Sequence, residues 1–221
     1  MALRIEVDPD ADAVAEYVAE QARTAIDDHG RFRFAVSGGH TPWAMFARLI
    51  QMPIEWNRVT IYQVDERVAP DGDPDRDLTH LRQALTPTAA AELRPMPVDE
   101  PDLDRATDEY ARSLPEAFDL VHLGRLGPDG HTASLVPGDA VLQVTDRDVA
   151  VTGAYQRRRR TTPTYRVLER APNVLWLITG ADKTDALARL KAGDCSIPAG
   201  RISATNALVI ADEAAAGSLV G

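Results

Sequence analysis

Apolar and polar positions along the chain follow two periods, one typical of helices and one of strands. In residues 11–28, Val14, Val18, Ala22 and Ile26 recur on one helical face, which predicts an amphipathic helix. Further helices are predicted over residues 43–50, 76–85, 102–114 and 182–191. Short apolar runs predict buried strands over residues 32–36, 59–64, 118–123, 148–152, 173–179 and 207–211.

The order of these elements predicts the fold class. Strands alternate with helices, which is typical of an α/β protein with a mostly parallel sheet. We expect one doubly wound, Rossmann-like domain over residues 1–221, with helices on both faces of the sheet. Ligands of such sheets bind outside the carboxyl ends of the strands, so the loops that follow strands are the candidates for chemistry.

Charge and composition narrow the classes of partner. The formal net charge of −10 argues against a nucleic-acid partner, and no apolar run approaches the roughly 18 residues of a membrane span. The N-terminus lacks the features of a signal peptide, and the single Cys195 fits a reducing compartment, so we expect a cytoplasmic protein. A small anionic ligand remains open, provided that its site is locally positive. Arg67 and the arginines of 157–160 are candidates for that charge.

The first unusual loop, Ser-Gly-Gly-His-Thr-Pro at 37–42, follows the strand at 32–36. Glycines let backbone N–H groups approach an anion, and the N-terminus of a following helix adds partial positive charge. Gly38, Gly39 and the Thr41 hydroxyl therefore form a candidate phosphate site. The alternative is a tight turn with Thr41 as the N-cap of the helix.

The second and third loops carry charged and titratable side chains. Asp65-Glu66-Arg67 ends the strand at 59–64, and Arg67 has the forked donor geometry that suits phosphate or carbonyl oxygens. A solvated charged surface is the alternative. In Gly-Pro-Asp-Gly-His at 127–131, His131 follows a turn and is expected at a helix start. Imidazole groups exchange protons near neutral pH, so His131 is a candidate base.

Several other chemistries find no support in the residue spacing. No His, Cys or carboxylate pair has metal-ligand spacing, so no metal is predicted. The glycine loops match neither the dinucleotide fingerprint nor the Walker phosphate loop, and no Gly-x-Ser-x-Gly elbow is present.

The three loops, in this order, resemble the 6-phosphogluconolactonase family. Its pattern is Ser-Gly-Gly-Ser-Thr-Pro, then Asp-Glu-Arg, then Gly-Pro-Asp-Gly-His-Thr-Ala-Ser-Leu-Phe-Pro. This chain has closely similar segments at 37–42, 65–67 and 127–137, and the likeness continues through 174–180, 197–201 and 211–216.

The resemblance implies a function and a set of site residues. The implied reaction is hydrolysis of 6-phospho-D-glucono-1,5-lactone to 6-phospho-D-gluconate in the oxidative pentose phosphate pathway, without metal or cofactor. A monomer or homodimer acting on this small molecule is expected. His131 would deprotonate water, Asp129 would orient His131, and Arg67 would oppose the negative charge that develops on oxygen. The implied substrate- and phosphate-binding residues are Gly38, Gly39, His40, Thr41, Asp65, Arg157 and Arg160.

The chain departs from the family pattern at four places. His40 replaces a small residue, Arg76-Asp77 replaces Ser-Asn, and the segment 123–127 is one residue longer than Leu-Gly-x-Gly. A Lys-Pro-rich stretch is replaced by the arginine run. Counting back from the strand at 173 aligns Arg160 with the family's strand arginine, and Arg157 or a neighbour would replace the phosphate-binding lysine; the alternative is a solvated basic loop.

Three other functions stay open. A glucosamine-6-phosphate deaminase shares the fold and a similar Asp-Gly-His loop, but its histidine is followed by a segment with a glutamate that Thr-Ala-Ser-Leu-Val-Pro at 132–137 lacks. A non-catalytic sugar-phosphate binder is the alternative outside enzymes. A lactonase for a related sugar-acid lactone is the third.

Overall fold

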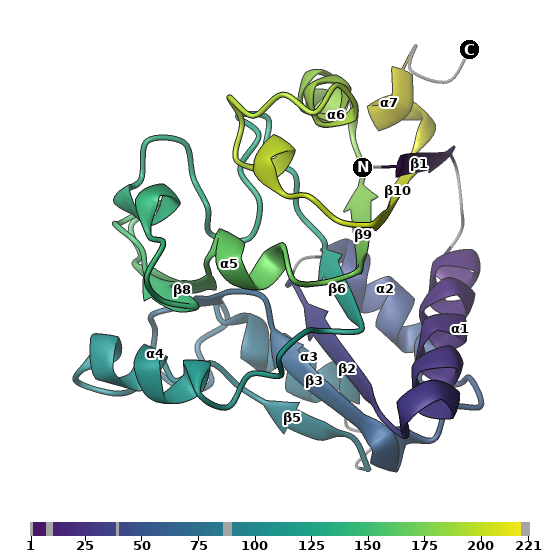
Figure 1. Cartoon of the computed structure of the whole chain (residues 1–221), viewed down its shortest axis with the longest axis horizontal. Helices are drawn as coiled ribbons and strands as arrows, with labels where there is room; N and C mark the ends of the chain where they lie inside the picture. The colour runs from purple at the N-terminus through teal and green to yellow at the C-terminus, as the bar shows by residue number, and fades with distance from the viewer. Residues whose placement is uncertain (1, 8–10, 39, 86–89, 218–221) are drawn as a thin grey trace.

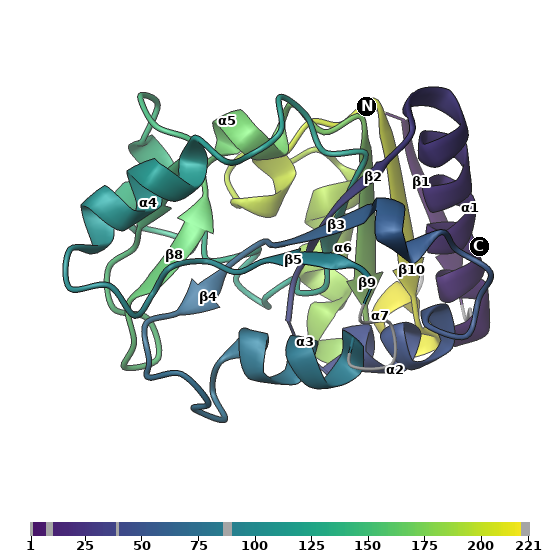
Figure 2. The same cartoon turned by 90° about the horizontal axis from the view of Figure 1, so that it is seen from below.

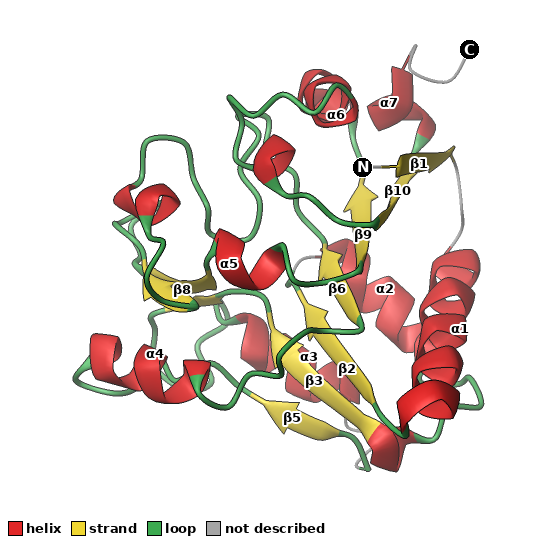
Figure 3. Ribbon diagram, in the orientation of Figure 1, coloured by secondary structure: helices red, strands yellow, loops and turns green. Residues whose placement is uncertain are grey.

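A parallel sheet of seven strands forms the centre of the computed structural model, which describes residues 2–7, 11–38, 40–85 and 90–217 (Figures 1 and 3). The strand order is β1-β10-β9-β6-β2-β3-β5, and every neighbouring pair is parallel. The predicted α/β fold with a mostly parallel sheet is confirmed. The strands are β1 Ala2–Val7, β2 Phe32–Val36, β3 Val59–Gln63, β5 Glu92–Arg94, β6 Leu120–Leu123, β9 Asn173–Ile178 and β10 Asn206–Ala211.

Helices cover both faces of this sheet because its strands bury side chains on both sides. In β2, Phe34 and Val36 pack into one apolar cluster with α1 and α2, whereas Ala35 packs into a second cluster on the opposite face. Figure 2 shows α1 on one side of the strands and α4 and α5 on the other. The helices are α1 Ala11–His29, α2 His40–Leu49, α3 Asp77–Leu85, α4 Leu103–Ala111, α5 Tyr165–Leu168, α6 Thr184–Lys191 and α7 Glu213–Ala216.

A second, antiparallel sheet of three strands lies beside the first. It consists of β4 Glu66–Arg67, β8 Arg160–Pro163 and β7 Val149–Val151, in the order β4-β8-β7. The strand predicted over 148–152 forms as β7 but belongs to this small sheet. The pairing of β4 with β8 places Arg67 directly opposite Arg160. It joins two candidate site segments that are far apart in the sequence.

Several local features differ from the predictions, and the short elements β4, α5 and α7 were not predicted. Strands β1 and β5 were not predicted, because β1 alternates with charged residues and β5 is only three residues long. The helix start expected at His131 is wrong. Gly130 and Ala133 have φ of 79° and 50°, which a right-handed helix does not accept, and the chain forms a turn closed by a bridge between Thr132 and Leu135.

The carboxylate of Glu66 is fully buried and connects β4 to the start of α3. It accepts hydrogen bonds from the backbone N–H groups of Asp77 and Leu78, at 3.0 and 2.8 Å, and from Gln63 Nε2 at 2.8 Å. The first N–H groups of a helix have no partner within the helix, and a negative charge beside them is favourable. Glu66 therefore fixes the position of α3 relative to the loop that carries Arg67.

Glu66→Gln is expected to lower the free energy of unfolding by about 3 kcal/mol, because the amide nitrogen cannot accept the donors that face one carboxylate oxygen. Urea unfolding of the variant and the wild type measures this loss. Glu55→Gln is the matched control, since the Glu55 side chain is 59% exposed, and a change within about 0.5 kcal/mol is expected there. Equal losses in the two variants would contradict the anchoring role of Glu66.

Candidate active site

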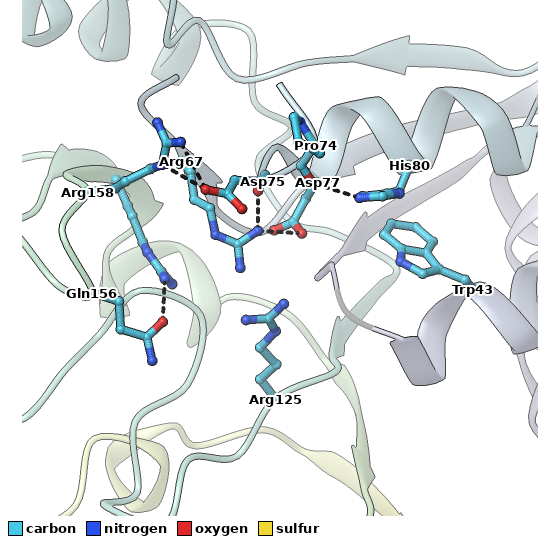
Figure 4. A pocket seen from close by; sticks show the side chains of 10 residues that line it. Trp43, Arg67, Pro74, Asp75, Asp77, His80, Arg125, Gln156 and Arg158 are labelled. Carbon is cyan, nitrogen blue, oxygen red and sulfur yellow. Dashed lines mark hydrogen bonds and ion pairs between the residues drawn. The ribbon is translucent and has the colours of Figure 1, made fainter. Parts of the chain in front are cut away.

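Two adjoining cavities, of about 460 and 260 Å³, open where β6 and β9 end. Arg125, Gln156 and Arg160 line both cavities, so we treat them as a larger and a smaller lobe of one cleft. The larger lobe, drawn in Figure 4, is also lined by Trp43, Arg67, Pro74, Asp75, Asp77, His80 and Arg158. The smaller lobe is also lined by residues 124 and 126–128, His131, Tyr155, residues 177–179 and Lys183.

His131 lines the smaller lobe and is held by Asp129. The Asp129 carboxylate lies 2.7 Å from His131 Nδ1 and accepts the His131 backbone N–H at 3.1 Å. Partial burial raises the pKa of Asp129, but the hydrogen bonds from His131 outweigh it and leave this pKa below its ordinary value. An ionised Asp129 keeps the proton on Nδ1, which leaves Nε2 of His131 as a proton acceptor.

The backbone around His131 is held by close packing. Gly130 has a φ of 79°, and a Cβ atom at this position would lie 2.4 Å from Cβ of Ile197. The Ala199 N–H donates to the Gly130 carbonyl oxygen at 3.0 Å, and the Gly127 N–H donates to the carbonyl oxygen of His131 at 2.8 Å. The loop therefore admits only glycine at 130, and its position sets the position of the imidazole.

Asp65 joins this loop to the second sheet. Its carboxylate accepts a hydrogen bond from Ser134 Oγ at 2.6 Å and lies 3.8 Å from Nη1 of Arg160. Arg160 is 3% exposed, and its guanidinium also lies over the Tyr155 ring, 5.4 Å from the ring centroid, while Tyr155 meets His131 edge-on. Asp65 thus lies behind the cleft, where it positions Arg160.

Arg67 lies in the larger lobe and is bound to α3. Its Nη1 donates to Oδ1 of Asp77 at 3.1 Å and to the backbone carbonyl of Asp75 (Figure 4). Burial raises the pKa of Asp77 to about 6; the charge of Asp65 adds to this rise and that of Arg67 opposes it. Asp77 therefore places a carboxylate, partly compensated by Arg67, in the larger lobe.

Gly38 lies against Asp77. A Cβ atom on Gly38 would lie 1.9 Å from Oδ1 of Asp77, so the close approach of these segments requires glycine. Helix α2 begins at His40, directly after the loop. Gly39 and the side chains of His40 and Thr41, which were expected to bind phosphate, lie outside the described part of the structure.

The arginine run divides between the cleft and the surface. Tyr155 and Arg158 exchange two backbone hydrogen bonds around Gln156 and Arg157, whose φ angles are 51° and 71°, as in a two-residue hairpin turn. The turn exposes Arg157 at its tip and does not bring it into either lobe. Arg158 lines the larger lobe instead, where it is paired with Asp73 and Asp75. Arg160 lines both lobes.

Several lining residues were not predicted. Arg125 is part of the lengthened segment 123–127, to which no role had been given. Lys183 follows the end of β9, so the rule that ligands bind beyond strand ends points to it. Trp43 lies on α2 and His80 on α3, with ring centroids 5.9 Å apart. Neither residue is part of a sequence motif that predicts a place in the cleft.

Neither a metal centre nor a membrane helix is found in the described part of the chain. No group of three or more His, Cys, Asp or Glu side chains there is arranged to hold a metal ion. No described helix combines the length and the apolar character that crossing a membrane requires.

Fold and cleft together define an α/β protein with a histidine–aspartate pair and an arginine-rich cleft at the carboxyl edge of its sheet. Residues 8–210 match the family described as glucosamine-6-phosphate isomerases/6-phosphogluconolactonase, and the chain belongs to this family. It is similar to a 6-phosphogluconolactonase of Nostoc sp., with 31% identity over 97% of each chain.

Solved structures show the same architecture. A 6-phosphogluconolactonase from Thermotoga maritima has a TM-score of 0.85 and 25% identity, covering 95% of this chain and 98% of its own. A monomeric glucosamine-6-phosphate deaminase has a TM-score of 0.83 at 16% identity, covering 96% and 98%. The fold alone therefore does not separate the two activities.

Gly130→Ala is expected to destabilise the protein by more than Gly72→Ala. Both glycines have positive φ, 79° and 78°, so each alanine carries a similar backbone strain of about 1 kcal/mol. Only Gly130 also meets a side chain, that of Ile197, whereas nothing lies within 4 Å of a Cβ on Gly72. We expect a further loss of about 1–3 kcal/mol in thermal or urea unfolding. Equal losses would show that Ile197 moves aside freely.

Asp77→Asn is expected to stabilise the protein at pH 7 and not at pH 4. The pKa of Asp77 is raised from 3.8 to about 6, so the folded state holds the proton more tightly, and stability falls as the pH rises through this window. Removing the ionisable group should restore about 3 kcal/mol at pH 7. Urea unfolding from pH 4 to 7.5 measures the difference, with the exposed Asp27→Asn as control. A variant less stable at every pH would show that the Arg67 ion pair outweighs burial.

Proposed function

We propose that this protein hydrolyses 6-phospho-D-glucono-1,5-lactone to 6-phospho-D-gluconate, a step of the oxidative pentose phosphate pathway. The Asp129–His131 pair carries this proposal, because it presents a proton acceptor in a cleft that arginines also line. The names of the relatives, 6-phosphogluconolactonases of Nostoc and Thermotoga among them, support the choice of substrate.

His131 acts as the general base in this proposal. Its Nε2 takes a proton from water while the water oxygen bonds to the lactone carbonyl carbon. The tetrahedral intermediate collapses with cleavage of the bond between that carbon and the ring oxygen, which receives the proton from His131. The carboxylic acid that forms then ionises and releases one proton. Asp129 keeps its charge throughout and stabilises the transient imidazolium.

Arginines supply the positive charge that the reaction and the substrate need. We assign the lactone ring to the smaller lobe beside His131 and the phosphate to the larger lobe, so that the substrate spans both. Arg160 lines both lobes and binds the phosphate. Arg67 binds the substrate from the larger lobe and opposes the negative charge that develops on the carbonyl oxygen. We expect Gly38, Gly39 and Thr41 to bind the phosphate as well.

The composition of the chain supports expectations about its location and its partners. With a net charge of −10 and one cysteine, we expect a cytoplasmic monomer or homodimer without a nucleic-acid partner. The mechanism requires only protein side chains and water, and we expect no metal or cofactor.

His131→Ala is expected to hydrolyse fresh 6-phosphogluconolactone no faster than the spontaneous reaction. Asp129→Asn should lower kcat by about 10²- to 10⁴-fold with little change in KM, because it disturbs the histidine tautomer. A pH indicator follows the released proton, with the spontaneous rate subtracted.

His29→Ala is the control, since His29 pairs with Asp119 and is absent from the residues lining either lobe. Its rate should equal that of the wild type. Activity that survives in His131→Ala would exclude His131 as the base. A wild type with no rate above the spontaneous one would favour a non-catalytic sugar-phosphate binder.

A further inference from the structure

Arg125 enters the cleft from the segment between β6 and His131. It is half-buried and lines both lobes. Figure 4 shows its side chain extending into the middle of the larger lobe, with the guanidinium directed toward Arg67 and Asp77. Arg125 belongs to the segment 123–127, which is one residue longer than the Leu-Gly-x-Gly of the family pattern.

The other cations of the cleft are already paired. Arg67 is bound to Asp77, Arg158 to Asp73 and Asp75, and Lys183 to Asp182 at 2.6 Å. Arg160 donates to Gln156 Oε1 at 3.3 Å and lies 3.8 Å from Asp65. Within the described residues, Arg125 has no hydrogen bond or ion pair. Its donors are therefore available to a bound anion.

The charges around Arg125 favour such an anion. Arg125 and Arg160 repel each other, and this repulsion contributes to lowering the pKa of Arg160, after burial as the main cause and beside the repulsion from Arg67. An anion between the two guanidinium groups converts this repulsion into two attractions. A phosphate monoester carries nearly two negative charges and three acceptor oxygens, which suit the forked donors of arginine.

We propose that Arg125 binds the phosphate group of the substrate, together with Arg160, and determines the preference for phosphorylated over unphosphorylated sugar lactones. The inference rests on the proposed function for the identity of the lactone. The role of Arg125 requires only that the ligand is a small sugar acid with a phosphate monoester, which Arg125 contacts directly.

Arg125→Ala should raise KM for 6-phosphogluconolactone by roughly 10- to 100-fold, the loss of one charge-assisted contact, with kcat within a few-fold of the wild type. Its kcat/KM for D-glucono-1,5-lactone, which lacks the phosphate, should stay within about threefold. Arg125→Lys keeps the charge but not the fork, so its KM should lie between those of the wild type and Arg125→Ala. Equal losses on both lactones would overturn the proposal.

Calorimetric titration with 6-phosphogluconate and with gluconate separates this inference from the proposed function. Arg125→Ala should weaken binding of 6-phosphogluconate by the same roughly 10- to 100-fold and leave gluconate unchanged. A wild type that fails to hydrolyse the lactone would count against the proposed function, while these titrations would still decide the role of Arg125. A wild type that binds 6-phosphogluconate no better than gluconate would overturn the inference.

A purely structural role for Arg125, as a counter-charge to Asp77, predicts a different binding result when Arg125→Ala is combined with Asp77→Asn. If Arg125 only neutralises Asp77, Arg125→Ala should have no effect on 6-phosphogluconate binding in an Asp77→Asn background. If it contacts the phosphate, the loss should persist there. Arg112→Ala, at an exposed arginine after α4, controls for the removal of one positive charge and should bind as the wild type does.

Discussion

The buried carboxylate of Asp65 is the constraint on which the arrangement of the cleft depends. It accepts a hydrogen bond from Ser134 in the loop that carries His131, and it lies beside Arg160 on β8. Asp65 itself follows the β3 strand of the main sheet. One carboxylate thus connects two central strands and the small antiparallel sheet, and a low-dielectric surrounding makes these contacts directional and strong. These contacts hold the loop of His131 against the strand that carries Arg160.

Glu66 complements Asp65 on the other side of the backbone. Asp65 is turned toward Ser134 and Arg160, whereas Glu66 is turned toward the N-terminus of α3. Arg67, the third residue of the motif, reaches the cleft between them. Each of the three charged residues therefore has a separate task, and the motif acts as a junction of the fold as well as a part of the site.

The cleft concentrates positive charge within an acidic protein. Arg67 is paired with Asp77, and Arg158 with Asp73 and Asp75, and these aspartates fix the geometry of the two arginines. The charge that remains for a ligand is concentrated at Arg125 and Arg160, where the two lobes meet. A net charge of −10 thus coexists with a locally positive site, because charges within a few ångströms outweigh the screened field of distant ones.

Local patterns in the sequence determined five of the seven strands of the main sheet, the longer helices on its faces and the loop that carries His131, because buried strands and amphipathic helices follow residue periodicity. The motifs also identified Arg67 and Arg160 before their pairing was known. Only the tertiary structure decided that β4 pairs with β8, since a two-residue strand carries no pattern, and that the hairpin exposes Arg157 while Arg158 faces the cleft. The availability of Arg125 was likewise decided in three dimensions, because it depends on which carboxylates the other arginines have already engaged.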